Sequence, residues 1–232
     1  MKSKDPYDAE LRTERAMKDR FMSHHVESPF IAENIPGFVG LKYFPIDPKY
    51  RTRAVLERVA TPEEAYLRTN RDGQAVMRYL GDLTFSLHST ALRLRVYHAG
   101  EGIGTSVFVP FRDLTSGRES YGPGRYLTFE LNQDDVYDID FNRAFNPYCA
   151  YTDAYECGFP PAENDLSVSV RAGEKAWSPD RNPRTPSSAV IEMLNRVAPR
   201  RPKAAVAALK RAKRTRSRSP SAREKTRVKS RS

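Results

Sequence analysis

The segment VYDIDFN, residues 136–142, alternates apolar side chains with side chains that carry oxygen atoms. In an extended strand successive side chains point to opposite faces, so Asp138, Asp140 and Asn142 would lie in a row on one face. Carboxylate and amide oxygens suit a hard cation such as Mg²⁺ or Ca²⁺, or a polar organic ligand. A solvated face opposite a core face produces the same alternation, so we assign the row no metal.

The chain contains two cysteines, Cys149 and Cys157, with seven residues between them. Structural zinc sites usually take two thiolates from a C-x₂₋₄-C pair, which this spacing does not match, although His24 or His25 would add ligands if the fold brought them near. A disulfide is the second alternative. We favour the third, packing beneath neighbouring tyrosines, because a free cysteine behaves as a small apolar side chain.

A cysteine nucleophile would need a neighbouring base, for which His88 and His98 are the candidates on predicted strands. The sequence contains no serine nucleophile elbow, phosphate-binding loop or dinucleotide-binding glycine motif, and GEGIG at residues 100–104 is typical of a hairpin turn. The sequence therefore assigns no reaction and no cofactor. Whether the protein is an enzyme stays open.

A second group of residues would recognise an anion if the fold gathered them. Arg125 would hold a carboxylate or phosphate through two hydrogen bonds, with Glu119 or Asp140 as acceptor or base, in a pocket lined by tyrosines. The alternative is a buried network of ion pairs and amides that fixes irregular loops. A cleft where Arg125, Asp140, Cys149 and Glu163 converge would support the ligand site. The residues that we assign to it are Asp113, Glu119, Tyr121, Arg125, Asp140, Asn142, Asn146, Tyr148, Cys149, Tyr151, Cys157, Glu163 and Asn164.

The apolar pattern predicts the elements that must position these side chains. Apolar residues spaced about 3.6 positions apart predict a helix over residues 7–25, and Pro29, Pro36 and Gly37 mark the next segment as a loop. From residue 39 to 170, β-branched and aromatic runs separated by turn residues predict an all-β region. The expected fold is mainly β, an antiparallel β-sandwich or barrel of eight or nine strands with the N-terminal helix packed on it.

Three local patterns refine this expectation. The segments at residues 83–88 and 92–97 alternate apolar and polar residues, so each strand has one buried face. SVFVPF at residues 106–111 is apolar nearly throughout, which predicts a strand covered on both sides, with Pro110 near an edge or bulge. In YGPGRY, Pro123 and Gly124 are expected at the two central positions of a type II turn.

Charge is distributed unevenly along the chain, whose net charge is +10. Residues 196–232 carry 15 Lys and Arg against the single acid Glu224, whereas residues 1–195 carry 24 Lys and Arg against 28 Asp and Glu. We therefore divide the chain into one β-rich domain, residues 1–177, and a disordered linker and basic tail, residues 178–232. Such a tail would bind nucleic acid without sequence preference, or it would only solubilise the protein.

The expected location follows from the absence of apolar segments. No apolar run in the sequence approaches the roughly 18 residues that a membrane helix needs, and the N-terminal segment is charged where a signal peptide would be apolar. We therefore expect a cytoplasmic protein that does not enter a membrane and whose cysteines stay reduced. The sequence indicates no oligomeric state.

Two long motifs resemble an uncharacterised microbial family, domain of unknown function 1684. They are FVPFRDLTSGRESYGPGRYL at residues 108–127 and DIDFNRAFNPYCAYTDAYECGFPPAENDLSVSVRAGEK at residues 138–175. SPF at residues 28–30 and GFVGLKYFPIDPKYR at residues 37–51 extend the resemblance over roughly residues 10–177. The resemblance implies no reaction or cofactor. The leading hypothesis is a pocket for an unidentified small ligand, with an anion as the first candidate, and the alternative is a non-enzymatic scaffold or nucleic-acid-associated protein that acts through its tail.

Overall fold

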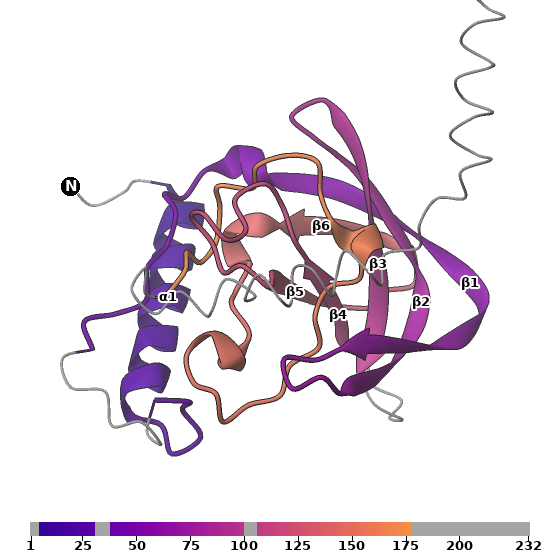
Figure 1. Ribbon diagram of the computed structural model, residues 1–232. Coiled ribbons are helices and arrows are strands. Elements are labelled where there is room, and N and C mark those ends of the chain that lie inside the picture. The colour runs from indigo at the N-terminus through magenta and orange to yellow at the C-terminus, as the bar shows by residue number, and fades with distance from the viewer. Residues whose placement is uncertain (1–4, 31–37, 100–105, 178–232) are drawn as a thin grey trace, which may run out of the picture. The chain divides into compact units, whose positions relative to one another are not determined.

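Two long antiparallel strands form the framework of the fold. In the computed structural model, which describes residues 5–30, 38–99 and 106–177, strand β1 runs over Arg51–Arg68 and strand β2 over Gln74–Leu87. The shorter strands are β3 (Thr90–Ala99), β4 (Ser106–Phe111), β5 (Arg125–Glu130) and β6 (Val136–Asp140). All six form one antiparallel sheet in the order β5-β4-β3-β2-β1-β6, which curls on itself into a near-barrel (Figure 1).

The pairing of the long strands slips at two places. The register of β1 and β2 shifts between Arg58 and Glu63, and that of β2 and β3 shifts between Tyr79 and Gly81. Pro62 lies in the first irregularity, where a residue without a main-chain N–H is tolerated. The predicted class, mainly antiparallel β with an N-terminal helix, is confirmed. The predicted count of eight or nine strands is wrong for the described residues, because β1 and β2 continue through positions that look like turns.

The main apolar core lies inside the curled sheet. Leu83 and Val96 are fully buried, and the alternation predicted for their two strands is confirmed. Tyr97 is an exception, because it belongs to the outward-facing series yet is buried beside Tyr79, with ring centroids 6.1 Å apart. Both faces of β4 are largely buried, as the sequence predicted. One continuous core therefore supports every strand.

Helix α1 (Pro6–His24) packs at one side of the near-barrel (Figure 1). It begins one residue before its predicted start, where the carboxylate of Asp5 accepts a hydrogen bond of 3.0 Å from the N–H of Tyr7. Met22 on its buried face contacts a small aromatic cluster that includes Phe30 and Tyr151. The helix therefore joins the N-terminal segment to the loops that follow β6.

The turn before β5 differs by one residue from its predicted position. The N–H of Gly124 donates to the carbonyl of Tyr121 at 3.1 Å, so Gly122 and Pro123 are the central residues of the hydrogen-bonded turn. Gly124 has the predicted positive φ, at 123°, and a Cβ there would lie 2.7 Å from the carbonyl oxygen of Phe111. Only glycine satisfies both requirements without strain.

Beyond β6 the chain continues through short 3₁₀ helices and isolated bridges. These helices are η2 (Phe141–Arg143), η3 (Tyr148–Ala150) and η4 (Ala162–Asn164), and a further 3₁₀ helix, η1 (Pro48–Tyr50), comes directly before β1. The linker and basic tail predicted for residues 178–232, and the hairpin turn predicted at 100–104, lie outside the described residues. Within the described ranges, no helix is long and apolar enough to cross a membrane.

Gly81 tests whether the bend of the sheet depends on close main-chain contact. Its φ is +150°, and a Cβ there would lie 2.2 Å from the carbonyl oxygen of Glu57. We expect Gly81→Ala to lower the free energy of unfolding by more than about 2 kcal/mol in urea denaturation. The control is Gly122→Ala, whose Cβ would come no closer than 3.5 Å to Gly117, so we expect a change within about 0.5 kcal/mol. Equal urea midpoints for the two variants would contradict this account.

Candidate functional site

Arg125, the predicted anion-binding arginine, is enclosed by its own chain. Its side chain is fully buried, and its NH2 group donates to Asp113 Oδ2 and to the carbonyl of Val170, each at 2.8 Å. Its NH1 group donates to the carbonyls of Ala172 and Glu174. Burial lowers the pKa of Arg125, and the adjacent Asp113 carboxylate opposes that shift. This geometry matches the alternative that we set beside ligand binding, a buried network that fixes loops.

Glu174, which the sequence did not suggest as a site residue, organises a second buried network. Its carboxylate accepts hydrogen bonds from the hydroxyl of Tyr151 at 2.5 Å and from the N–H of Asn146 at 2.9 Å, and it pairs with Lys18 of α1 at 2.5 Å. Burial is the main cause that raises the pKa of Tyr151, and Glu174 raises it further. Two residues of the predicted site, Asn146 and Tyr151, therefore help to hold α1 on the domain.

Asn164 replaces a missing part of the sheet. Its amide oxygen accepts from the N–H of Arg95 at 2.7 Å, and its Nδ2 donates to the carbonyls of Arg95 and Pro110 at 3.0 and 2.6 Å. The residues recorded as directly paired between β3 and β4 are Tyr97 and Phe108. Asn164 thus bridges two strands beyond that pair, which is a structural role.

Three further residues of the predicted site, Glu119, Tyr148 and Glu163, lie at the surface. Glu163 pairs with Arg95 at 3.1 Å, and Glu119 pairs with Arg171 at 2.9 Å, in both cases with partly exposed side chains. Tyr148 is also exposed. The structure therefore distributes the predicted residues among several separate sets of contacts, and Arg125, Asp140, Cys149 and Glu163 have different partners.

The structure does bring the two cysteines together. Cys149 is buried beside Tyr121 and Ala150, and Cys157 packs against this group. The hydroxyl of Tyr121 lies 3.6 Å from Cys149 Sγ. Both thiols are free. His88, one of the candidate bases, instead stacks edge-on against Tyr50, with ring centroids 4.9 Å apart.

A cleft lies where the near-barrel remains open. Strands β5 and β6 are consecutive in the chain, yet they occupy opposite edges of the sheet and form no ladder with each other. We call the space between them the seam cleft. Its volume is about 410 Å³. Its lining residues are Tyr7, Glu10, Arg51, Leu127, Thr128, Phe129, Asp138, Ile139, Asp140 and Arg143.

Main-chain groups of both edges face the seam cleft. On β5, Tyr126 exchanges hydrogen bonds with Phe145 on the side away from β4, so Thr128, two residues further on, also points its N–H and C=O away from β4. On β6, the register with β1 likewise directs the main-chain groups of Asp138 away from β1. No main-chain partner is recorded for these groups among residues 5–30, 38–99 and 106–177. They are available to a ligand.

The polar wall of the seam cleft is built around Asp140. Tyr7 donates its hydroxyl hydrogen to Asp140 Oδ2 at 2.8 Å, and the N–H of Asn142 donates to Asp140 Oδ1 at 2.9 Å. Burial and the hydrogen bond to Asp140 raise the pKa of Tyr7, so the phenol stays protonated and donates. The predicted row is altered at its end, because η2 begins at Phe141 and Asn142 is buried. Its Nδ2 still donates to Asp140 Oδ1 at 2.9 Å, and also to the carbonyl of Asp47 at 2.8 Å.

Charge pairing within the seam cleft is incomplete. Arg143 lies 2.7 Å from Glu10, 3.1 Å from Glu14 and 3.5 Å from Asp140. The guanidinium of Arg51 instead stacks on the ring of Tyr7, 4.6 Å from its centroid. Of the lining residues, the sequence had suggested Asp138 and Asp140 as oxygen ligands. It missed the two arginines and Tyr7, because they come from three segments that only the fold brings together.

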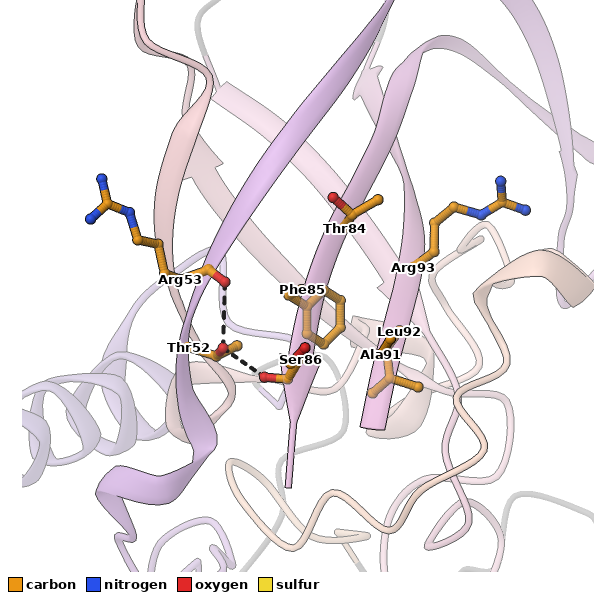
Figure 2. Close-up of a pocket in the computed structure, with 8 residues that line it drawn as sticks. All are labelled: Thr52, Arg53, Thr84, Phe85, Ser86, Ala91, Leu92 and Arg93. Carbon is orange, nitrogen blue, oxygen red and sulfur yellow. Dashed lines mark hydrogen bonds between the residues drawn. The ribbon is translucent and has the colours of Figure 1, made fainter. Parts of the chain in front are cut away.

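A second hollow lies over strands β1, β2 and β3. It has a volume of about 620 Å³, and Figure 2 shows Thr52 bridging to the carbonyl of Ser86 at 2.7 Å. In the same view its two arginines, Arg53 and Arg93, point away from each other, so no charged group is aimed into it. The seam cleft is therefore the better candidate site.

Substitution of Arg125 distinguishes framework from surface arginines. Arg125→Met would leave Asp113 buried without its partner and three carbonyls without donors, so we expect a loss of about 3–5 kcal/mol in the free energy of unfolding. The matched control is Arg112→Met, which removes a partly exposed pair with Asp165 and should cost less than about 1 kcal/mol. Chemical denaturation of both variants measures the difference. A loss below that of the control would overturn the framework role.

Comparison with known proteins gives a family but no activity. The family model described as "Protein of unknown function (DUF1684)" matches residues 36–175. The chain is also similar to the solution NMR structure of the uncharacterised protein from gene locus rrnAC0354 of Haloarcula marismortui, with 38% identity, a TM-score of 0.59, and coverage of 73% of this chain and 94% of that chain. A search of curated proteins finds no match. Because the family model matches residues 36–175, where the long motifs of the sequence also lie, the chain belongs to the DUF1684 family.

Proposed function

We propose that the seam cleft binds a small zwitterion with an apolar group, such as a free α-amino acid. The observation that carries the proposal is that the cleft holds an arginine and a carboxylate, Arg51 and Asp138, that form no ion pair among the described residues. A ligand with a carboxylate and an ammonium group would pair with both. The anionic group of the ligand, which the sequence assigned to Arg125, is thereby assigned to Arg51.

The guanidinium of Arg51 is already oriented for a carboxylate. Its stacking on the Tyr7 ring covers one face of the guanidinium and leaves the donor edges free for two parallel hydrogen bonds. The ring is itself fixed by the hydrogen bonds of the Tyr7 hydroxyl with Asp140 and Asn142. Because these contacts hold the side chain in place before binding, less conformational entropy is lost when a ligand arrives.

The opposite side of the ligand would meet β6. The exposed carboxylate of Asp138 would pair with an ammonium group. The seam-facing main-chain groups of Thr128 and Asp138 add a donor and an acceptor on each edge. These groups would satisfy the polar end of an amino acid without any movement of the strands.

An apolar floor gives the ligand's side chain a place to bind. Leu127, Phe129 and Ile139 line the cleft from the inward-facing positions of β5 and β6. A volume of about 410 Å³ accommodates a single amino acid with a large side chain. None of the lining residues is a cysteine, serine or histidine. The proposal is accordingly one of binding, without a reaction.

Three related probes test this recognition by NMR titration. L-phenylalanine carries both charges, 3-phenylpropionate carries only the carboxylate, and 2-phenylethylamine carries only the ammonium group. We expect phenylalanine to bind with a dissociation constant on the order of 1 mM, because a ligand of this size in an open cleft gains little free energy. Arg51→Ala should weaken phenylalanine and phenylpropionate about tenfold and leave phenylethylamine unchanged, and Asp138→Asn should weaken only the two probes that carry an ammonium group.

Arg93→Ala is the control, because Arg93 lies on β3, lines the second hollow and does not line the seam cleft. It should bind all three probes as the unmodified protein does. Absence of phenylalanine binding at ten millimolar, or equal losses in the Arg51 and Arg93 variants, would overturn the proposal.

The basic tail is the subject of a second proposal, which rests on charge alone. Residues 196–232 carry 15 Lys and Arg against one acid, and such a segment binds phosphates by releasing counterions. We expect the full chain to be retained on duplex DNA at low salt and released as salt rises, and a chain of residues 1–195 to flow through. Equal retention of the two chains would show that the tail does not carry the DNA binding. Both proposals take the protein to be cytoplasmic.

A further inference from the structure

The two cysteines occupy a defined site that the proposed ligand cleft does not use. They are the only cysteines in the chain, and they pack in one cluster with Tyr121 and Ala150. Cys149 is buried in its aromatic surroundings, whereas Cys157 is partly exposed. A thiol that solvent reaches therefore lies directly against one that it does not reach.

The segment that carries Cys157 is fixed to the β1–β2 hairpin. The N–H of Cys157 donates to Asn70 Oδ1 at 2.7 Å, and Asn70 Nδ2 donates to the carbonyl of Tyr155 at 2.9 Å. Between them, Glu156 accepts a hydrogen bond of 2.6 Å from the hydroxyl of Thr69. These contacts on both sides hold the sulfur of Cys157 in one position relative to the sheet.

Hydrogen-bond donors converge on the sulfur of Cys157. The thiol of Cys149 and the main-chain N–H groups of Cys149 and Tyr148 interact with it, whereas the hydroxyl of Tyr126 donates to the carbonyl of Gly158 at 2.7 Å. Such donors stabilise a thiolate more than a thiol, because the thiolate is the stronger acceptor.

The two thiols consequently differ in acidity. The hydrogen bond from the Cys149 thiol is the main cause that lowers the pKa of Cys157 to about 7, and the main-chain donors lower it further while burial opposes them. The same hydrogen bond, together with burial, raises the pKa of Cys149. The titratable groups that face Cys157 are Cys149 from η3, Tyr126 from β5 and Tyr121 from the preceding turn. Cys157 is therefore the more acidic of the two thiols.

From this cluster of donors and paired thiols we propose that Cys157 and Cys149 form a thiol–disulfide exchange site for small disulfides, with Cys157 as the attacking thiolate and Cys149 as the resolving thiol. Packing alone, the role favoured from the sequence, does not require a second thiol or convergent donors. A metal site would require more ligands, and within the described residues no group of three or more His, Cys, Asp or Glu side chains is placed to hold an ion.

The chemistry proceeds in two displacements. The Cys157 thiolate attacks one sulfur of a small disulfide, a new bond joins Cys157 to that sulfur, the original disulfide bond breaks, and the other half leaves as a thiolate. Cys149 then gives its proton to this released thiolate and attacks Cys157 Sγ, which expels the second half. This second thiolate takes up from solvent the proton that Cys157 released when it ionised. The protein loses two protons and two electrons, and the small disulfide becomes two thiols.

The formation of the mixed disulfide prepares the second displacement. The Cys157 thiolate is the partner whose hydrogen bond and charge raise the pKa of Cys149 most. When Cys157 becomes part of a mixed disulfide, that charge disappears and the proton on Cys149 is held less strongly. The resolving thiol is thereby activated only after the attacking thiolate has reacted.

The pH dependence of alkylation tests the assignment without any substitution. We expect iodoacetamide to modify Cys157 in the folded chain first, at a rate that rises with pH and reaches half of its maximum near pH 7, because the thiolate is the reactive form. Peptide mapping by mass spectrometry identifies the modified residue. A midpoint near pH 9, or initial modification of Cys149, would overturn the assignment.

Oxidised glutathione tests the exchange and the order of the two thiols. The unmodified chain should end two hydrogens lighter, with Cys149 joined to Cys157. Cys149→Ser should accumulate the mixed disulfide on Cys157, and Cys157→Ser should react at least tenfold more slowly than Cys149→Ser. Circular dichroism establishes that both variants are folded. If the unmodified chain and Cys149→Ser remain unreacted while folded and react only in urea, the two thiols are structural and the proposal fails.

Discussion

The domain depends most on the hydrogen bonds of the Arg125 guanidinium, which bonds to main-chain carbonyls as a neighbouring β-strand would. The carbonyls of Val170, Ala172 and Glu174 are two residues apart and point the same way, as the carbonyls along one edge of an extended segment do. Arg125 bonds all three, while the other edge of this segment bonds Lys42 and Phe44 through their main chains. A single side chain thus satisfies an edge that would otherwise be buried without partners.

The same solution recurs between β3 and β4, where the amide of Asn164 supplies the hydrogen bonds that a continuing ladder would make. The seam between β5 and β6 differs from both. The chain runs directly from β5 to β6 across this seam. The main-chain groups of the two strands nevertheless face a cleft rather than a hydrogen-bonding side chain. The architecture therefore satisfies two of its incomplete ladders internally and leaves a third accessible, which is why the seam is the place where recognition is expected.

Much of the fold is predictable from local pattern because strand alternation and helix periodicity are recorded in neighbouring residues. The length of β1 is not, because Pro62 looks like a break and only the sheet reveals that a register shift accommodates it. The family resemblance and the grouping of charged and amide residues also drew attention to Arg125 and Asn164. Most of their partners are main-chain groups, however, and a sequence carries no signal for which main-chain groups a side chain will meet.

The residues that line the seam cleft could not be predicted from the sequence either. Tyr7, Arg51 and Arg143 are unremarkable in the sequence, where tyrosine and arginine are common surface residues. Their significance depends on which charges are already neutralised, and that depends on contacts between residues more than 90 positions apart, such as Tyr7 with Asp140. The cysteines were noticed from the sequence, but the donors around Cys157 come largely from main-chain groups, which leave no trace in residue identity.

The contact between Lys18 and Glu174 also constrains the order of assembly. Helix α1 lies near the beginning of the chain, and the carboxylate that anchors it lies 156 residues later. A helix with so few apolar positions gains little from forming alone. During synthesis, α1 lacks this anchor until the final segment of the domain has emerged and settled against Arg125. Folding of this domain is therefore completed from its C-terminal end, and its first element is among the last to reach its native place.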